Sequence, residues 1–174
     1  MTHDAVALST LMARAVEFGT RHVEKGGLPF VGQLVGPDGY ASEYGVNRVH
    51  ETGDATAHAE IVAMRLALTE RGTPDLAGTR LLATGEPCGL CYRFALDQRV
   101  EHIYVAVDAE TVASWGIDYL AGYPAFGIDR ARLRRDGLVR DLPVEAGDEP
   151  FQRFTQAVFP RRSCSSAPPT KGPS

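Results

Sequence analysis

Two short motifs, each opening a predicted helix, constrain this chain more than any other feature. The first, Thr56–Glu60, reads Thr-Ala-His-Ala-Glu, and the second, Gly85–Cys91, reads Gly-Glu-Pro-Cys-Gly-Leu-Cys. His58, Cys88 and Cys91 offer one imidazole and two thiols, which are preferred ligand types of zinc. Because three ligands must meet at one ion, the fold has to bring the starts of two helices together.

The spacing inside each motif agrees with a metal at the helix ends. Cys88 and Cys91 are three residues apart and share one side of a helical turn. Pro87 suits a helix start, whose partial positive charge favours the thiolate that zinc requires. Glu60 lies about 200° around a helix from His58, so both reach one pocket only beyond the helix end. We therefore expect Glu60 to stay off the metal and to move protons.

Each motif alone has other interpretations. An isolated His-x-Glu is common on protein surfaces, and a Cys-x-x-Cys pair can be a redox pair. Cys164 could add a fourth protein ligand and make the zinc site structural. The agreement of ligand types, spacing, proline and free glutamate favours a catalytic site with one position open for water.

Composition bounds the remaining possibilities. The chain has 174 residues, 44% of them hydrophobic and 23% charged, which suits one domain, expected over 1–160, followed by a disordered tail over 161–174. The net charge of −4 gives no general attraction to nucleic acid or membranes. No segment has the roughly 20 apolar residues of a membrane span. No secretory signal is visible, and three cysteines make no disulfide framework, so we expect a cytoplasmic protein.

Alternation of apolar strand-like and helix-like segments predicts an α/β fold with three layers, α/β/α, around a mixed central sheet. The first two strands should form an antiparallel hairpin, the strand 103–107 should be buried on both faces, and 138–144 should lie at an edge. The basic segment 129–136 is expected to be a solvated helix face rather than a phosphate site. Helices are expected over about 5–25, 58–72, 88–97 and 150–159, and the other strands over 30–35, 40–47 and 79–84.

These motifs resemble the cytidine deaminase-like superfamily of zinc deaminases, and within it the bacterial guanine deaminases and the tRNA adenosine deaminases. The resemblance covers roughly residues 5–154 and rests on Gly27–Gly32, Asn47, Thr56–Glu60 and Glu86–Cys91. It implies a cytidine deaminase-like fold, one Zn²⁺ and hydrolytic deamination of a nucleobase or nucleoside. Zinc would activate a water molecule, and Glu60 would carry its proton to the ring nitrogen and the leaving amine.

The resemblance also implies where the substrate binds. Trp115–Asp118 is similar to a loop of the guanine deaminases, and Pro150–Phe154 to their aromatic C-terminal segment, which crosses to a partner subunit's active site. Glu86 would contact the substrate, orient its loop or cap the cysteine helix. The complete set of expected contacts is Asn47, Phe30, Ala57, Glu86, Pro87, Asp118, Phe151 and Phe154.

Two positions depart from the family pattern and affect the choice of substrate. Tyr92-Arg93-Phe94 follows the second cysteine where small residues are usual. Tyr119 falls where the guanine deaminases have a second loop aspartate, unless Asp118 serves in its place. Guanine or a related purine is the leading substrate. Cytosine, cytidine, adenosine in tRNA, a specialised metabolite and a non-catalytic zinc-stabilised domain remain open. We expect a homodimer that acts on a small molecule, with no nucleic-acid or membrane partner.

Overall fold

A mixed five-stranded sheet forms the centre of the protein, as the apolar segments predict. The computed structural model describes residues 3–158. Its strands are β1 Val31–Val35, β2 Gly45–Val46, β3 Arg80–Gly85, β4 His102–Val107 and β5 Val139–Asp141. They run in the order β2-β1-β3-β4-β5; β1 is antiparallel to β2 and β3, whereas β3, β4 and β5 are parallel.

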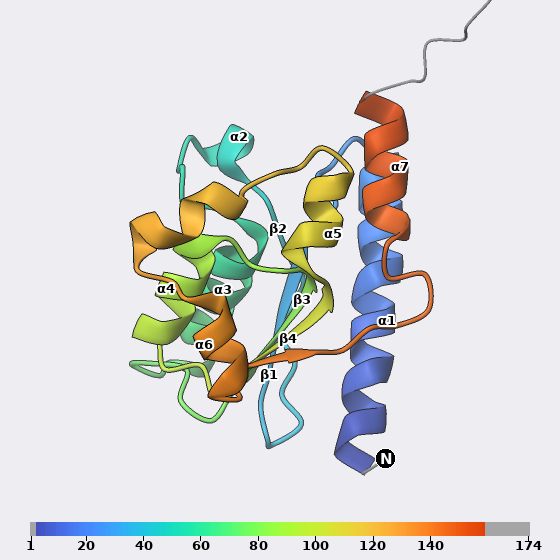
Figure 1. Cartoon of the computed structure of the whole chain (residues 1–174). Coiled ribbons are helices and arrows are strands. Elements are labelled where there is room, and N and C mark those ends of the chain that lie inside the picture. Colours follow the sequence, from blue (N-terminus) through green and yellow to red (C-terminus); the bar gives the residue numbers. More distant parts are fainter. Residues whose placement is uncertain (1–2, 159–174) are drawn as a thin grey trace, which may run out of the picture.

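Helices cover both faces of this sheet and complete the expected α/β/α layers. The helices are α1 His3–Glu24, α2 Val49–Thr52, α3 Ala59–Arg71, α4 Gly89–Asp97, α5 Ala109–Ser114, the 3₁₀ helix η1 Leu120–Phe126, α6 Arg130–Arg135 and α7 Glu149–Val158. α1 and α7 pack together on one side, and α3 and α4 pack together on the other (Figure 1). The main core, which includes Ile61, Leu81, Tyr92 and Ile103, lies between the sheet and the α3–α4 layer.

Several boundaries differ from the sequence expectations. The predicted strand over 40–47 is reduced to Gly45–Val46 and one bridge between Val35 and Ala41. The segment 48–55, which lies between the expected strand 40–47 and the expected helix 58–72, contains the one-turn helix α2. The segment 109–126, for which no element was predicted, contains α5 and η1. The Asp108 carboxylate caps α5 by accepting a 2.7 Å hydrogen bond from the Thr111 N–H. A capping side chain therefore starts a helix too short to show a periodic pattern.

Strand β4 is fully buried on one face only, which corrects the expectation of burial on both. Ile103, Val105 and Val107 are buried, whereas His102, Tyr104 and Ala106 alternate with them and are partly exposed. The reason is that α1 lies mainly over β1 and β3, so the α1 side of β4 is only partly covered. The edge position of β5 is confirmed, and the strand ends before Pro143.

Two predictions concern residues outside the described part of the chain. Phe159, Cys164 and the tail expected over 161–174 lie outside it. Within residues 3–158, no helix is both long enough and apolar enough to cross a membrane.

Candidate active site

Two helix N-termini meet at the three predicted metal ligands. His58 is the N-cap of α3 and Cys88 is the N-cap of α4, both with extended backbone, at φ −71°, ψ 156° and φ −68°, ψ 172°. Neither side chain caps its own helix, so each is free to point across the gap. Pro87 precedes the cap and is therefore outside α4 rather than at its first turn. The partial positive charge of both helix ends favours thiolate and other anionic groups here.

The spacing of the ligand atoms fits a tetrahedral zinc ion. Cys88 Sγ lies 3.6 Å from Cys91 Sγ and 3.4 Å from His58 Nδ1, and Cys91 Sγ lies 3.5 Å from the same nitrogen. Zinc bond lengths of about 2.3 Å to sulfur and about 2.0 Å to nitrogen place tetrahedral ligands about 3.8 Å apart for S–S and about 3.5 Å apart for S–N. The three residues are thus arranged to hold zinc through Nδ1 and two sulfurs.

The two thiols are electrostatically unequal. A hydrogen bond from Cys91, with a smaller contribution from His58, lowers the pKa of Cys88 to about 4. The same shared hydrogen bond, together with burial, raises the pKa of Cys91 well above the ordinary value. Cys88 is therefore a ready thiolate ligand, and Cys91 gives up its proton when a cation binds beside it.

Glu60 stands beside this ligand set as a buried carboxyl group. It is 4% exposed, and its Oε2 accepts a hydrogen bond from Cys91 Sγ at 3.3 Å. Burial is the main reason that the pKa of Glu60 is raised to about 7, with a further contribution from the negative charge of Cys88. A carboxyl group with a pKa near neutrality is suited to both accept and return a proton, and a bound cation would favour its charged form.

Close packing of backbone fixes the position of Glu60. Gly32 of β1 and Gly45 of β2 are paired in the sheet, directly under the start of α3. An ideal Cβ on Gly32 would lie 2.8 Å from the Glu60 Cα, and one on Gly45 would lie 2.2 Å from the Ala59 carbonyl oxygen. Only glycine lets α3 approach the sheet this closely, and this approach places Glu60 inward.

A cavity of about 160 Å³ opens over the ligands. Asn47 is at its wall, and the Asn47 Oδ1 accepts a 3.2 Å hydrogen bond from the Val49 N–H, so this bond does not use the two donors of the amide NH₂ group. Phe30 and Tyr119 supply aromatic walls, with ring centroids 6.1 Å apart. The lining residues are Leu28, Phe30, Asn47, His58, Ala59, Glu60, Glu86, Cys88 and Tyr119.

The other five expected contact residues do not line this cavity. Ala57 and Pro87 are buried residues that directly precede the ligands His58 and Cys88. The Asp118 carboxylate is exposed and accepts a 2.9 Å hydrogen bond from the Leu120 N–H. Phe151 is fully buried behind Phe30, at 5.2 Å between centroids, and Phe154 is half-buried on the next turn. Their contacts with substrate therefore stay predictions.

Tyr119 is the main wall residue that the motifs did not identify as a contact. It adjoins Asp118, but its ring turns toward the cavity because its hydroxyl donates a 2.7 Å hydrogen bond to the Glu86 carbonyl oxygen. The signal in the sequence was the departure from the family pattern at this position. Leu28 and Ala59 were also missed as contacts, although both lie within the motif segments 27–32 and 56–60.

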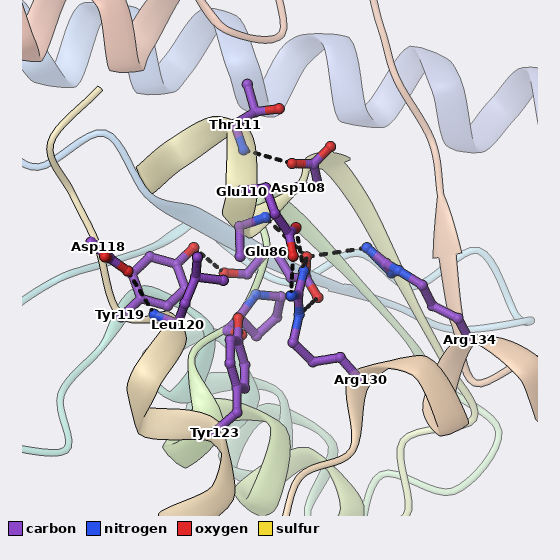
Figure 2. Close-up of polar contacts among 12 residues, drawn as sticks. Glu86, Asp108, Glu110, Thr111, Asp118, Tyr119, Leu120, Tyr123, Arg130 and Arg134 are labelled. Carbon is purple, nitrogen blue, oxygen red and sulfur yellow. Dashed lines mark hydrogen bonds and ion pairs between the residues drawn. The ribbon is translucent and has the colours of Figure 1, made fainter. Parts of the chain in front are cut away.

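The Glu86 carboxylate lies at the centre of a buried network (Figure 2). It is fully buried and accepts hydrogen bonds from Arg130 Nε at 2.8 Å and Nη2 at 2.6 Å, and from Arg134 Nη2 at 3.1 Å. The Tyr92 hydroxyl at 2.9 Å and the Ala109 N–H at 3.0 Å complete the set. The structure therefore supports the loop-orienting alternative for this side chain.

The same network corrects the expectation for the basic helix. Arg130 and Arg134 point inward to Glu86, with side chains 18% and 28% exposed, instead of forming a solvated face. Arg132 and Arg135 are exposed, as expected. Arg130 also lies over the Tyr123 ring, 5.0 Å from its centroid, and pairs with Glu110 at 2.7 Å.

Comparisons with known proteins agree with this geometry. A family model of the cytidine and deoxycytidylate deaminase zinc-binding region matches residues 6–107. The chain is 35% identical over 171 residues to the tRNA(Ile)-lysidine synthase of Deinococcus radiodurans, a match that covers 92% of this chain but only 29% of that protein. It is 33% identical over 110 residues to the guanine deaminase of Bacillus subtilis, covering 63% of this chain and 70% of the relative. Against the tRNA-specific adenosine deaminase of Aquifex aeolicus it is 36% identical over 95 residues, covering 54% and 62%.

Solved structures share the fold. The B. subtilis guanine deaminase structure has a TM-score of 0.60 at 32% identity, covering 68% of this chain and 73% of that one. The guanine deaminase of Nitrosomonas europaea has a TM-score of 0.70 at 22% identity, covering 83% and 82%. The family model spans more than half of the chain and includes both ligand motifs, and the predicted fold is confirmed. This chain belongs to the cytidine and deoxycytidylate deaminase zinc-binding family.

Proposed function

We propose that this protein is a zinc-dependent hydrolase that releases ammonia from a nucleobase or nucleoside, with guanine or a related purine as the leading substrate. The observation that carries the proposal is the position of Glu60. It is a buried carboxyl group, 3.3 Å from one of three convergent zinc ligands, and it faces a cavity with apolar walls. A purely structural zinc site has no use for a proton carrier at that point.

The donor set suits a catalytic rather than a closed metal site. His58, Cys88 and Cys91 would hold the ion, and three protein ligands leave one tetrahedral position for a small molecule. When bound, zinc supplies a water molecule activated for attack at neutral pH. Glu60 adjoins the ligand set, because its Oε2 accepts a hydrogen bond from Cys91 Sγ.

Glu60 would then move two protons in sequence. It takes a proton from the attacking water and gives it to the ring nitrogen next to the attacked carbon, as the new C–O bond forms. It next moves the proton of the added hydroxyl to the exocyclic amine, the C–N bond breaks, and ammonia leaves behind a ring carbonyl. Proton transfer by a positioned group contributes about 10²- to 10⁴-fold to the rate.

The cavity walls support a flat, uncharged substrate. Phe30, Tyr119 and Leu28 offer apolar surface, and the Asn47 amide offers a hydrogen-bond donor for a ring acceptor. No lysine or arginine is among the lining residues, so nothing there would pair with a phosphate. Guanine leads because a relative that this chain covers well carries that name. Ammonia release by the zinc-loaded protein from guanine, adenine, cytosine and their nucleosides tests the proposal, and no release from any of them would refute it.

A tRNA adenosine is the second candidate, because relatives in A. aeolicus and Agrobacterium fabrum are named tRNA-specific adenosine deaminases. This candidate needs a cationic surface for the phosphate backbone. The two arginines of α6 closest to the site are already paired with Glu86. Conversion of adenosine to inosine in a tRNA, faster than any deamination of free bases, would favour this candidate instead.

A zinc-stabilised domain without activity is the third candidate, and it needs a fourth protein ligand. Within residues 3–158, the cluster of metal-ligating side chains is limited to His58, Cys88 and Cys91. Cys164 lies outside this range, so we would measure the zinc content of Cys164→Ser. Full retention of zinc is expected, whereas loss of zinc would identify a closed, structural site.

We also propose a homodimer working in the reducing cytoplasm, where thiolate ligands stay available for zinc. Sedimentation at micromolar concentration tests the dimer, and a species of 18.8 kDa, the mass of one chain, would contradict it.

A further inference from the structure

The Glu86 carboxylate has no part in the proposed reaction, yet five donors converge on it. Two arginines, one tyrosine hydroxyl and one backbone N–H satisfy both of its oxygens inside the protein. A buried ionic network is costly to desolvate, and apolar residues that replace a whole network of this kind often stabilise a fold equally well. The cost of this network indicates that it holds neighbouring parts of the protein in place.

The network holds the peptide that leads directly into the first cysteine ligand. The Glu86 N–H donates to the Val107 carbonyl at 2.8 Å, and its own carbonyl accepts the Tyr119 hydroxyl. The next carbonyl, of Pro87, accepts the Tyr123 hydroxyl at 2.9 Å. Main chain and side chain of this dipeptide are thus fixed from several sides, immediately before Cys88.

Arg130 contacts both the Glu86 carboxylate and Tyr123, the side chain that bonds the Pro87 carbonyl. Its guanidinium donates twice to Glu86 and lies over the ring of Tyr123, the residue that holds the Pro87 carbonyl (Figure 2). Arg134 adds a third ionic contact from the next turn of α6. α6 is far from Cys88 in sequence, but it is connected to the peptide before Cys88 through the Glu86 carboxylate and through the Tyr123 ring.

We propose that Arg130 and Arg134 are positioning residues for the metal site, acting through Glu86 to hold Cys88 and the cavity wall residue Tyr119. The proposal deepens the proposed deaminase function but depends on it only for its kinetic readout. Positioned ligands bind metal more tightly because less freedom is lost on binding, and outer partners of ligands typically change metal affinity by about 10- to 100-fold.

The test compares zinc release from the zinc-loaded full chain into excess chelator, well below the melting temperature of each variant. We expect Arg130→Met to release zinc about 10-fold faster than the parent and Arg130→Lys, which keeps a cation, to recover part of the difference. Arg132→Met is the matched control, because Arg132 is on the same helix, 72% exposed, and pairs with Asp136 instead. It should release zinc at the parental rate.

A double variant separates positioning through Glu86 from general stabilisation. Glu86→Gln combined with Arg130→Met should release zinc no faster than the faster single variant, because both changes act on one contact. If guanine is turned over, kcat per bound zinc should fall in the same variants. A merely structural ion pair would lower the melting temperature and leave zinc release and kcat per bound zinc unchanged.

Three results would overturn the inference: folded Arg130→Met that keeps zinc as long as the parent does, equal release from Arg132→Met and Arg130→Met, or additive effects in the double variant. If Arg130→Met does not fold, Arg134→Met, which removes one of the five hydrogen bonds, takes its place with a smaller expected acceleration. If the parent deaminates nothing, the proposed function fails, while the zinc-release comparison still decides this inference.

Discussion

The two halves of the metal site are held in different ways. The half that carries His58 and Glu60 rests on backbone contact, since α3 lies directly on Gly32 and Gly45. The half that carries Cys88 and Cys91 rests on side chains, with Glu86 bonded to residues of α4, α5 and α6. One site therefore combines a backbone contact that an added methyl group would disturb with a charged network that the loss of one partner would leave incompletely satisfied.

This difference predicts which kind of substitution should disturb each half of the site. Added volume under α3 must move backbone, because the atoms in the way belong to Glu60 and Ala59. Removed charge around Glu86 must leave a buried, incompletely satisfied carboxylate. The chemistry at Glu60 depends on both halves, because it needs the glutamate from one and the metal ligands from the other.

The largest expected effect is the loss of turnover in Glu60→Gln. Glutamine has nearly the same shape as glutamate but cannot accept a proton at neutral pH. We expect kcat to fall by at least about 10²-fold, with zinc content and melting temperature close to those of the parent. All three quantities are measured on one preparation. Turnover within a few-fold of the parent would show that Glu60 is not the proton carrier.

Gly45→Ala tests the backbone-packed half. A methyl group at this position meets the Ala59 carbonyl at 2.2 Å, so the first turn of α3 has to shift. Overpacking of this kind costs about 3 kcal/mol, which corresponds to a melting temperature lower by about 6–12 °C. Thermal unfolding provides the measurement.

Gly122→Ala is the matched control for that variant. Gly122 lies in η1, has no atom within 4 Å of an added Cβ and needs no left-handed backbone. Its substitution should leave the melting temperature unchanged or slightly higher, because alanine restricts the unfolded chain. Equal losses in both variants would show that the contact between α3 and the sheet is not special.

Phe151→Leu tests whether the C-terminal helix belongs to the site or only to the core. Phe151 is fully buried and packs on Phe30 and on Trp115, at a centroid distance of 5.8 Å. The loss of ring volume should cost about 1.5 kcal/mol in urea unfolding. If α7 helps to close the cavity, KM rises as well, because Phe30 loses its support. Phe154→Leu changes a half-buried position on the same helix, and its free energy of unfolding and KM are compared with those of Phe151→Leu.

Glu110→Gln tests the outer end of the side-chain network and has the smallest expected effect. The hydrogen bond from Arg130 lowers the pKa of Glu110 to about 2, yet the Glu110 side chain is 61% exposed. An exposed pair of this kind contributes about 0.5 kcal/mol. Because the folded pKa lies below that of free glutamate, this contribution is present above about pH 4.5 and is lost as the pH falls toward about 2. Urea unfolding of parent and variant should therefore differ near neutrality and converge in acid.

Sequence alone predicted the parts of the site that depend on local chemistry. His58, Cys88, Cys91 and Glu60 are identifiable because ligand type and spacing within a few residues limit what they can do. The long apolar segments gave the central strands for the same reason, since periodicity is a local property.

The missed parts depend on contacts between distant segments. Arg130 meets Glu86 across 44 positions, and no local pattern distinguishes it from Arg132, which is exposed on the same helix. Tyr119 reaches the cavity because its hydroxyl bonds a carbonyl 33 positions earlier. The one-turn helix α2 and the six-residue α5 are too short for a periodic signal, so tertiary packing and a single cap decide them.

The bond from the Tyr119 hydroxyl to the Glu86 carbonyl has a consequence for redesign. It fastens a wall of the cavity to main chain, so the position of this wall depends on the peptide that the Glu86 side chain anchors. An engineer who wants to admit a bulkier ring can vary Leu28, a cavity-lining residue that lies between α1 and β1, outside both metal-bearing helices. Varying Tyr119 instead removes one of the bonds that hold the peptide before Cys88, so substrate range and metal retention would have to be screened together at that position.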